Sequence, residues 1–249
     1  MKIIVLLTLA IMLSAVSIRS QRQENKSIAN NKSVPAAESS SGDAAIIAKT
    51  AVSAHGGDNL TQMRSFLARG TVDVTGAFSY VIPATFMMVV AGDRYAFELN
   101  NPFQPLRQVY DGESTYSSGY ELPPVTSLGF PLLTKIYVDG YRVSVLPEPK
   151  KMRIGFRITT PEGFFTDFVV NPKSGLVKGY ESRYDINGRI VTTSVEIDEF
   201  ETVKGIVVPE RYSQRFDLGQ MTAYANFKTK QILINSEIDD SVFEVPTKP

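Results

Sequence analysis

The chain has 249 residues with 26 basic and 26 acidic side chains, so its formal net charge is zero. Without an excess of positive charge there is no basic field to attract a nucleic-acid backbone, and no nucleic-acid partner is expected. The chain has no cysteine and one histidine, His55, which excludes disulfides, thiolate chemistry and a zinc site made of Cys and His ligands. We expect no cofactor and no metal.

Residues 1–17 have the order of a secretory signal peptide. Lys2 precedes an apolar run, 3–13, and the small residues Ala15 and Ser17 follow it. The apolar run is shorter than the roughly 20 residues that span a bilayer, so cleavage near Ser17 is favoured over a retained membrane anchor. We therefore expect an exported protein, located in the periplasm of a bacterial envelope.

Residues 18–43 are predicted to form a disordered polar linker, because they are rich in Ser and Asn and contain no aromatic residue. A single folded domain is expected over 44–249. It opens with an amphipathic helix that Asp43 caps and that ends at His55, where Gly56 and Gly57 permit the positive φ of a helix terminus. His55 is interpreted as a helix end beside the negative end of the helix dipole, because a catalytic triad or zinc site would need partners that the chain lacks.

After residue 65 apolar and polar side chains alternate, which is typical of strands with one face in a core. The alternation covers 66–74, 93–99, 151–158, 176–186, 190–200, 207–216 and 221–232. Turn sequences such as Asp-Gly and Asn-Pro-Lys-Ser-Gly separate these segments, which predicts an antiparallel meander. Two short helices cannot cover the apolar face of such a sheet. We therefore expect a mainly β domain, a curved antiparallel sheet forming an unclosed β-barrel, or half-barrel, with N-terminal helices.

Two segments favour a cavity inside this half-barrel over a filled core. The strand at 84–91 is apolar on both faces, so one face has to pack on something other than the interior. The insert at 121–143 is apolar, rich in proline and long enough for a helix over 124–138, which we interpret as a lid across the mouth. The expected cavity walls are Phe86, Met88, Tyr95, Phe97, Met152, Ile154, Phe156 and Phe168, and the expected lid residues are Phe130, Leu133 and Ile136.

Residues 92–118 resemble the periplasmic lipoprotein carriers of the LolA/LolB type. In both, a strand with aromatic residues, here Tyr95 and Phe97, precedes an Asp-Gly hairpin at 111–112 and an aromatic strand with Tyr116. Weaker similarity to proteins described as outer membrane lipoprotein-sorting extends over about 44–246. The resemblance implies an unclosed β-barrel whose helix-capped cavity holds acyl chains. In the carriers an arginine of the aromatic strand latches the lid, whereas Ala96 stands at the aligned position here.

Two functions are compatible with these features. The first is an exported, soluble, monomeric carrier that binds the acyl chains of a lipid or lipoprotein for transfer across the periplasm to the outer membrane, together with membrane-associated protein partners. The alternative is an envelope sensor or protein-interaction module on the same fold, without transport, which binds a partner through an exposed strand at 84–91. An enzyme is not expected, because no phosphate loop, nucleophile elbow or metal-ligand cluster occurs.

Overall fold

The residues described by the structure, a computed structural model, are 37–76, 80–103, 105–118, 129–147, 153–186, 189–217 and 222–245. All of them belong to one compact unit, Ala36–Pro249. The predicted signal peptide and most of the predicted linker lie outside the described residues. Within the described ranges, no helix combines the length and the apolar character needed to cross a membrane.

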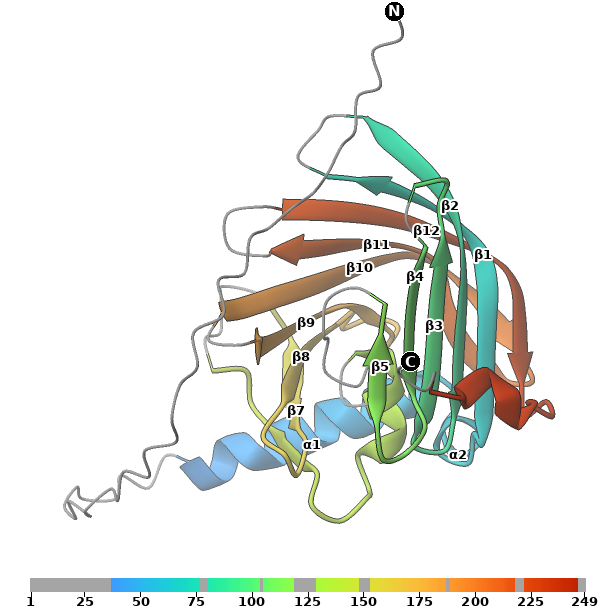
Figure 1. Cartoon of the computed structure of the whole chain (residues 1–249). Helices are drawn as coiled ribbons and strands as arrows, with labels where there is room; N and C mark the ends of the chain where they lie inside the picture. Colours follow the sequence, from blue (N-terminus) through green and yellow to red (C-terminus); the bar gives the residue numbers. More distant parts are fainter. Residues whose placement is uncertain are drawn as a thin grey trace, which may run out of the picture. The chain divides into compact units, whose positions relative to one another are not determined.

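The described strands form one antiparallel sheet of 12 strands in the order β5-β4-β3-β2-β1-β12-β11-β10-β9-β8-β7-β6. The strands are β1 (Ser65–Thr75), β2 (Val81–Ala91), β3 (Arg94–Asn100), β4 (Leu106–Tyr110), β5 (Thr115–Ser117), β6 (Arg142–Ser144), β7 (Gly155–Thr159), β8 (Phe165–Val170), β9 (Val177–Ile186), β10 (Arg189–Val203), β11 (Ile206–Asp217) and β12 (Thr222–Ile234). β5 and β6 lie at the two free edges, so the described strands bend into a half-barrel that does not close (Figure 1). The predicted fold class is confirmed.

The alternating pattern places one side of each strand in the interior. On β1, Phe66, Ala68 and Val72 are buried while Arg69 and Asp73 are exposed, as the two-residue period predicts. The alternation did not indicate β4, β5, β6 and β8. These strands have only three to six residues each, too few to establish a period.

Helix α1 (Ala37–Ala54) lies against β6 and β7 and covers one part of the concave face of the sheet (Figure 1). It buries Ala44, Ala48, Ala51 and Val52, which recur at the spacing of one helical face. The helix begins at Ala37, ahead of the cap expected at Asp43. Helix propensity does not account for the earlier start, because Ser39–Ser41, Gly42 and Asp43 are weak helix formers.

His55 ends α1 as predicted, but not as a cation beside the helix dipole. The side chain is fully buried, and burial lowers the pKa of the imidazole below its usual 6.5. Its Nδ1 lies 2.6 Å from the Val207 carbonyl oxygen, and its Nε2 accepts a hydrogen bond from the Val177 backbone N–H at 3.0 Å. Because a carbonyl can only accept, the proton is on Nδ1. His55 is thus a neutral cross-link between the end of α1 and strands β9 and β11.

The strand at 84–91 corresponds to β2, which is covered on its inner face and, around Val89, on its outer face, while Thr85 is exposed. Phe86 faces the interior, whereas Val89 belongs to a second apolar cluster on the outer face. There it packs with Ala96 and Val109 beneath Phe243 of the short 3-10 helix η3 (Asp240–Phe243). An exposed strand available to a protein partner, as the interaction-module hypothesis requires, is therefore contradicted.

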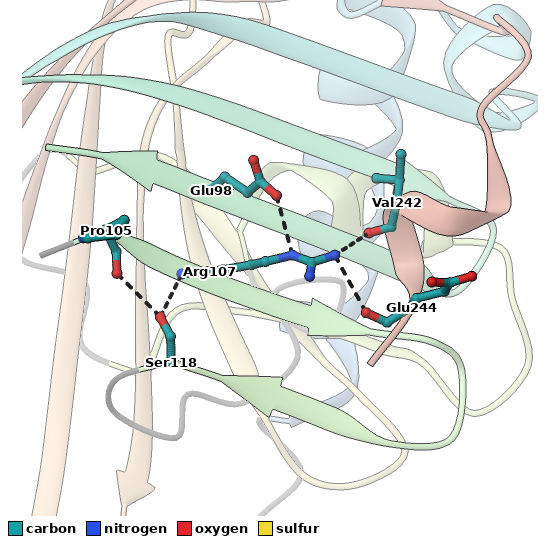
Figure 2. Close-up of polar contacts among 6 residues, drawn as sticks. All are labelled: Glu98, Pro105, Arg107, Ser118, Val242 and Glu244. Carbon is teal, nitrogen blue, oxygen red and sulfur yellow. Dashed lines mark hydrogen bonds and ion pairs between the residues drawn. The ribbon is translucent and has the colours of Figure 1, made fainter. Parts of the chain in front are cut away.

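Arginines on the outer face hold the C-terminal segment, residues 238–245, against this cluster. Arg94 forms an ion pair with Asp240 at 2.7 Å and lies 4.4 Å from the centre of the Phe243 ring. Arg107 pairs with Glu98 at 3.3 Å and donates to the carbonyl oxygens of Val242 (3.3 Å) and Glu244 (3.5 Å), as Figure 2 shows. The aligned latch position, Ala96, also lies on this outer face, away from the cavity. Neither Arg94 nor Ala96 takes part in closing a lid.

The insert at 121–143 differs from the predicted lid helix. Residues 124–128 lie outside the described residues. The described part forms only the 3-10 helix η2 (Phe130–Lys135), followed by turns that lead into β6. Pro131 in the first turn and Gly140 near the end, together with β-branched Ile136 and Val138, disfavour a long α-helix.

Candidate ligand cavity

The interior of the half-barrel holds a cavity of about 260 Å³. Side chains of β1–β4 and β9–β12 line it, together with Met63 after helix α2 (Asp58–Thr61) and Gly129–Pro131 at the start of η2. None of the lining residues is charged. The volume lies just below the roughly 300–1,000 Å³ typical of sites for drug-sized ligands, so the cavity has room for one chain rather than a bundle of chains.

The strand register gives this cavity a hairpin end. Thr75 at the end of β1 pairs with Val81 on one side and Tyr224 on the other, so the ends of β1, β2 and β12 lie together here. Leu99 pairs with Leu106 beside the β3–β4 connection, and both residues line the cavity. The hairpin end of the cavity is therefore the end at which β1, β2, β3, β4 and β12 meet their neighbours' termini.

The opposite, helix end lies where β1 begins. Phe66, Tyr95 and Tyr180 line the cavity here, and the start of η2 covers it. The backbone N–H of Gly129 donates to Thr166 Oγ1 at 3.2 Å, and Tyr180 is hydrogen-bonded to the Phe130 backbone. Polar side chains of β8 and β9 thus fix the η2 segment over this end.

Aromatic pairs stiffen the wall between the two ends. Phe227 of β12 packs edge-on against Phe86 at 5.0 Å between ring centroids, and it stacks on Tyr212 of β11 at 4.7 Å. Such pairs contribute about 0.5–1.5 kcal/mol each beyond the area they bury. Met88 and Met63 supply the adaptable part of the lining, since the unbranched thioether side chain fills irregular space.

The residues predicted as walls and lid fall into three groups. Met88, Tyr95, Phe97 and Phe130 line the cavity. A second group packs behind the lining or in the neighbouring core: Phe86, Phe156, Phe168, Leu133 and, half-buried, Ile136. Ile154 is 42% exposed and precedes β7, whereas Met152 lies outside the described residues.

The position of α1 separates the filled part of the interior from the open part. Phe156 and Phe168 stack on each other at 5.2 Å, in the same buried cluster as Ala48 and Ala51 of α1. The helix fills the space above β6 and β7. Strands β3, β11 and β12 have no such cover on their concave side among the described contacts of α1, and there the cavity remains.

Four tyrosines of the lining stay uncharged. Burial raises the pKa of Tyr180 and of Tyr184 to about 12, and it raises the pKa of Tyr95 and Tyr212 well above 10. The negative charge that an ionised Tyr212 or Tyr180 would carry raises the pKa of Tyr95 further. These three side chains, from β3, β11 and β9, all line the cavity. The cavity is therefore neutral, apolar along its walls and able to form hydrogen bonds.

The hydroxyl groups of Ser182 and Thr193 in the lining are paired with neighbouring side chains. Ser182 Oγ lies 2.7 Å from Thr166 Oγ1, and Thr193 Oγ1 accepts from Gln214 Nε2 at 2.8 Å. Thr229 Oγ1 is buried without a hydrogen-bond partner in the part of the chain that the structure describes. The alternating pattern could not single out these polar residues, because Ser and Thr at inward positions look like interruptions of the apolar face.

No protein-family model matches the sequence, and no curated protein sequence matches it. Solved structures are similar in fold. A DUF1329 family protein from Desulfovibrio piger is 11% identical, with a TM-score of 0.45, and the alignment covers 81% of this chain and 97% of that chain. An outer membrane lipoprotein-sorting protein domain from Vibrio parahaemolyticus is 10% identical, with a TM-score of 0.46 and coverages of 82% and 97%.

A LolA superfamily protein from Nitrosomonas europaea is 12% identical, with a TM-score of 0.48, and the alignment covers 78% of this chain and 97% of that chain. At these identities the similarity concerns the fold alone.

Proposed function

We propose that this protein is an exported carrier that binds an acyl chain of a lipid or lipoprotein inside the half-barrel. The observation that carries the proposal is the uncharged cavity of about 260 Å³, lined by Met, Phe, Val, Leu and Tyr side chains. Each methylene moved from water into such a lining contributes about 0.8 kcal/mol. No lining side chain is a charged group that could act as an acid, a base or a metal ligand, so the proposal includes no catalytic step.

The proposed location is the periplasm, with transfer to the outer membrane and with membrane-associated protein partners. It rests on the arrangement of residues 1–17, where Lys2 and a short apolar run precede Ala15 and Ser17. N-terminal sequencing of the protein recovered from the periplasm tests cleavage near Ser17.

The cavity itself is tested with a filling variant and a matched control on the same strand. Ala225 of β12 is buried and lines the cavity, whereas the next residue, Asn226, is exposed on the opposite face. Ala225→Leu adds three carbon atoms inside, and Asn226→Leu adds the same side chain outside. We expect the first variant to lower the affinity for a fluorescent fatty acid at least tenfold, and the second to leave it unchanged.

Native mass spectrometry and organic extraction of the purified protein complete the experiment. A stoichiometric lipid or acylated peptide supports the carrier. If the wild-type protein carries no lipid and takes up no fluorescent fatty acid, the aromatic side chains are only a core and the proposal is wrong. Circular dichroism of both variants shows whether a loss of binding reflects a filled cavity or an unfolded domain.

A further inference from the structure

Two tyrosine hydroxyls of the cavity have no hydrogen-bond partner among the described residues. They belong to Tyr95 of β3 and Tyr212 of β11, and both side chains line the cavity. The fully enclosed unpaired hydroxyls of the described chain are those of Thr160 and Thr229 instead. The hydroxyls of Tyr95 and Tyr212 therefore border the open space of the cavity. Few hydroxyls inside a protein remain unpaired unless a water or a ligand satisfies them.

The packing of the rings holds these phenols in place. Tyr212 stacks on Phe227 with 4.7 Å between ring centroids and 11° between ring planes. A third phenol of the lining, Tyr180, packs 5.8 Å from the Phe168 ring, and its hydroxyl is hydrogen-bonded to the Phe130 backbone. Rings that are already fixed lose little conformational entropy when a ligand binds to them. The phenols are therefore preorganised for a ligand in the cavity.

Tyr95, Tyr212 and Tyr180 approach one region of the cavity from different strands. In the sheet, β3 and β11 are separated by β2, β1 and β12, so Tyr95 and Tyr212 meet across the concave face. A charge on Tyr212 or Tyr180 would raise the pKa of Tyr95, and a charge on Tyr180 would raise that of Tyr212. Such an influence falls off with distance, so the three hydroxyls lie near one another.

Phenol chemistry defines the ligand group that suits this region. Burial raises the pKa of Tyr95 and Tyr212 well above 10, so each keeps its proton and can donate it in a hydrogen bond. A carboxylate or an ammonium group would lose its hydration here without meeting an opposite charge, because no lining residue is charged. The carbonyl of an ester or an amide is neutral, and its two lone pairs accept two hydrogen bonds. Such a carbonyl matches two neighbouring donors.

We propose that the cavity binds the ester or amide carbonyl of an acylated ligand, and that the hydroxyls of Tyr95 and Tyr212 donate hydrogen bonds to its oxygen. This inference rests on the proposed function and specifies its ligand: an acyl group in ester or amide linkage rather than a free fatty acid carboxylate. The carbonyl of the acyl group then lies inside the half-barrel together with the chain.

The test compares two neutral probes that differ only in the carbonyl. Methyl hexadecanoate and hexadecyl methyl ether, delivered from cyclodextrin, compete with a fluorescent fatty acid for the full exported protein. We expect the ester to bind about tenfold more tightly than the ether. In the double variant Tyr95→Phe/Tyr212→Phe this ratio falls to near one, while the affinity for the ether is unchanged because the cavity keeps its shape. The control Tyr137→Phe, at a position that is 60% exposed and outside the lining, keeps the wild-type ratio.

The infrared stretch of the bound ester carbonyl gives a readout that a purely structural role of the tyrosines would not change. This band lies above the amide band of the protein, and hydrogen bonding lowers its frequency. We expect a lower frequency in the wild-type complex than in the double variant. Should the double variant lose ether binding, the single variants Tyr95→Phe and Tyr212→Phe are compared in the same way.

The outcomes separate this inference from the carrier proposal. Equal affinities of the wild-type protein for the two probes, or an ester preference that persists without the two hydroxyls, would overturn the inference while the carrier proposal stands. Hexadecanoic acid is a third probe. If its carboxylate binds more tightly than the ester and depends on the same two tyrosines, the inference is likewise wrong. If neither the probes nor the fluorescent fatty acid bind, both proposals are wrong.

Discussion

Replacing His55 tests whether the neutral imidazole joins α1 to the sheet beneath the cavity. In His55→Ala the Val207 carbonyl and the Val177 N–H each lose a partner, and each such buried group costs about 1–3 kcal/mol. The ring also packs against Phe130 at 5.1 Å and Phe200 at 5.8 Å, so its removal leaves a cavity. We expect the free energy of unfolding to fall by about 4 kcal/mol.

The pH dependence of stability gives a second, independent readout. Burial lowers the pKa of His55 in the folded protein, whereas the unfolded chain has the ordinary value of 6.5. Below about pH 6.5 the unfolded chain therefore takes up a proton that the folded chain does not. The free energy of unfolding decreases as the pH falls, by at most about 1.4 kcal/mol per pH unit, until the folded imidazole is protonated. Above pH 6.5 this contribution is absent.

Urea unfolding followed by far-UV circular dichroism measures both effects, and the chain contains no tryptophan that would offer a stronger fluorescence signal. His55→Gln is the control, because an amide keeps donors and acceptors but has no charge to gain. The difference between wild type and this variant isolates the imidazole from the carboxylates common to both. Since His55 is the only histidine, its NMR signals also give its pKa directly. A pKa at or above 6.5, or a loss below 1 kcal/mol in His55→Ala, would refute the reasoning.

Three further predictions concern the cover of the cavity, the C-terminal segment and the buried phenols. Gly129 has a φ of 75°, and a Cβ atom added there would lie 3.0 Å from the Tyr180 ring, so Gly129→Ala should lower the free energy of unfolding by about 2 kcal/mol. Gly163→Ala is the control and should lower it less, because φ is 92° there but the space around the new Cβ is open. Arg107→Leu removes the ion pair and both carbonyl contacts shown in Figure 2, so limited proteolysis should cut the C-terminal segment faster while the half-barrel stays intact. Burial raises the pKa of Tyr180 and Tyr184 to about 12 in the folded protein, whereas the unfolded chain has the ordinary value of about 10, so the free energy of unfolding should decrease above pH 10. In an alkaline titration, the absorbance of the last tyrosines to ionise should rise at the same pH at which the circular dichroism signal is lost. If all the tyrosines ionise near pH 10 while the protein is still folded, the prediction is contradicted.

The two-residue period was sufficient to locate most strands and their inward faces. In 93–99 it assigned Tyr95 and Phe97 to one side and Ala96 to the other, and the structure confirms this division. The period reports local backbone geometry, which each segment carries in its own residues. The same holds for the end of α1 at His55, because the glycines that follow are next to it in the chain.

Other features depended on segments that are distant in the sequence. His55 is neutral because Val177 and Val207 reach it from β9 and β11, which no pattern around residue 55 indicates. Val89 on the outer face of β2 is buried because the C-terminal segment returns to pack on it.

The division between cavity and core was likewise set by the tertiary structure. Phe97 and Phe156 occupy equivalent positions in alternating strands, so the sequence alone assigns both to the interior. Phe97 lines the cavity, whereas Phe156 is buried in the core cluster beside α1. The alternating period determines which face of a strand turns inward, but the curvature of the sheet and the place where a helix docks determine whether that face meets protein or open space.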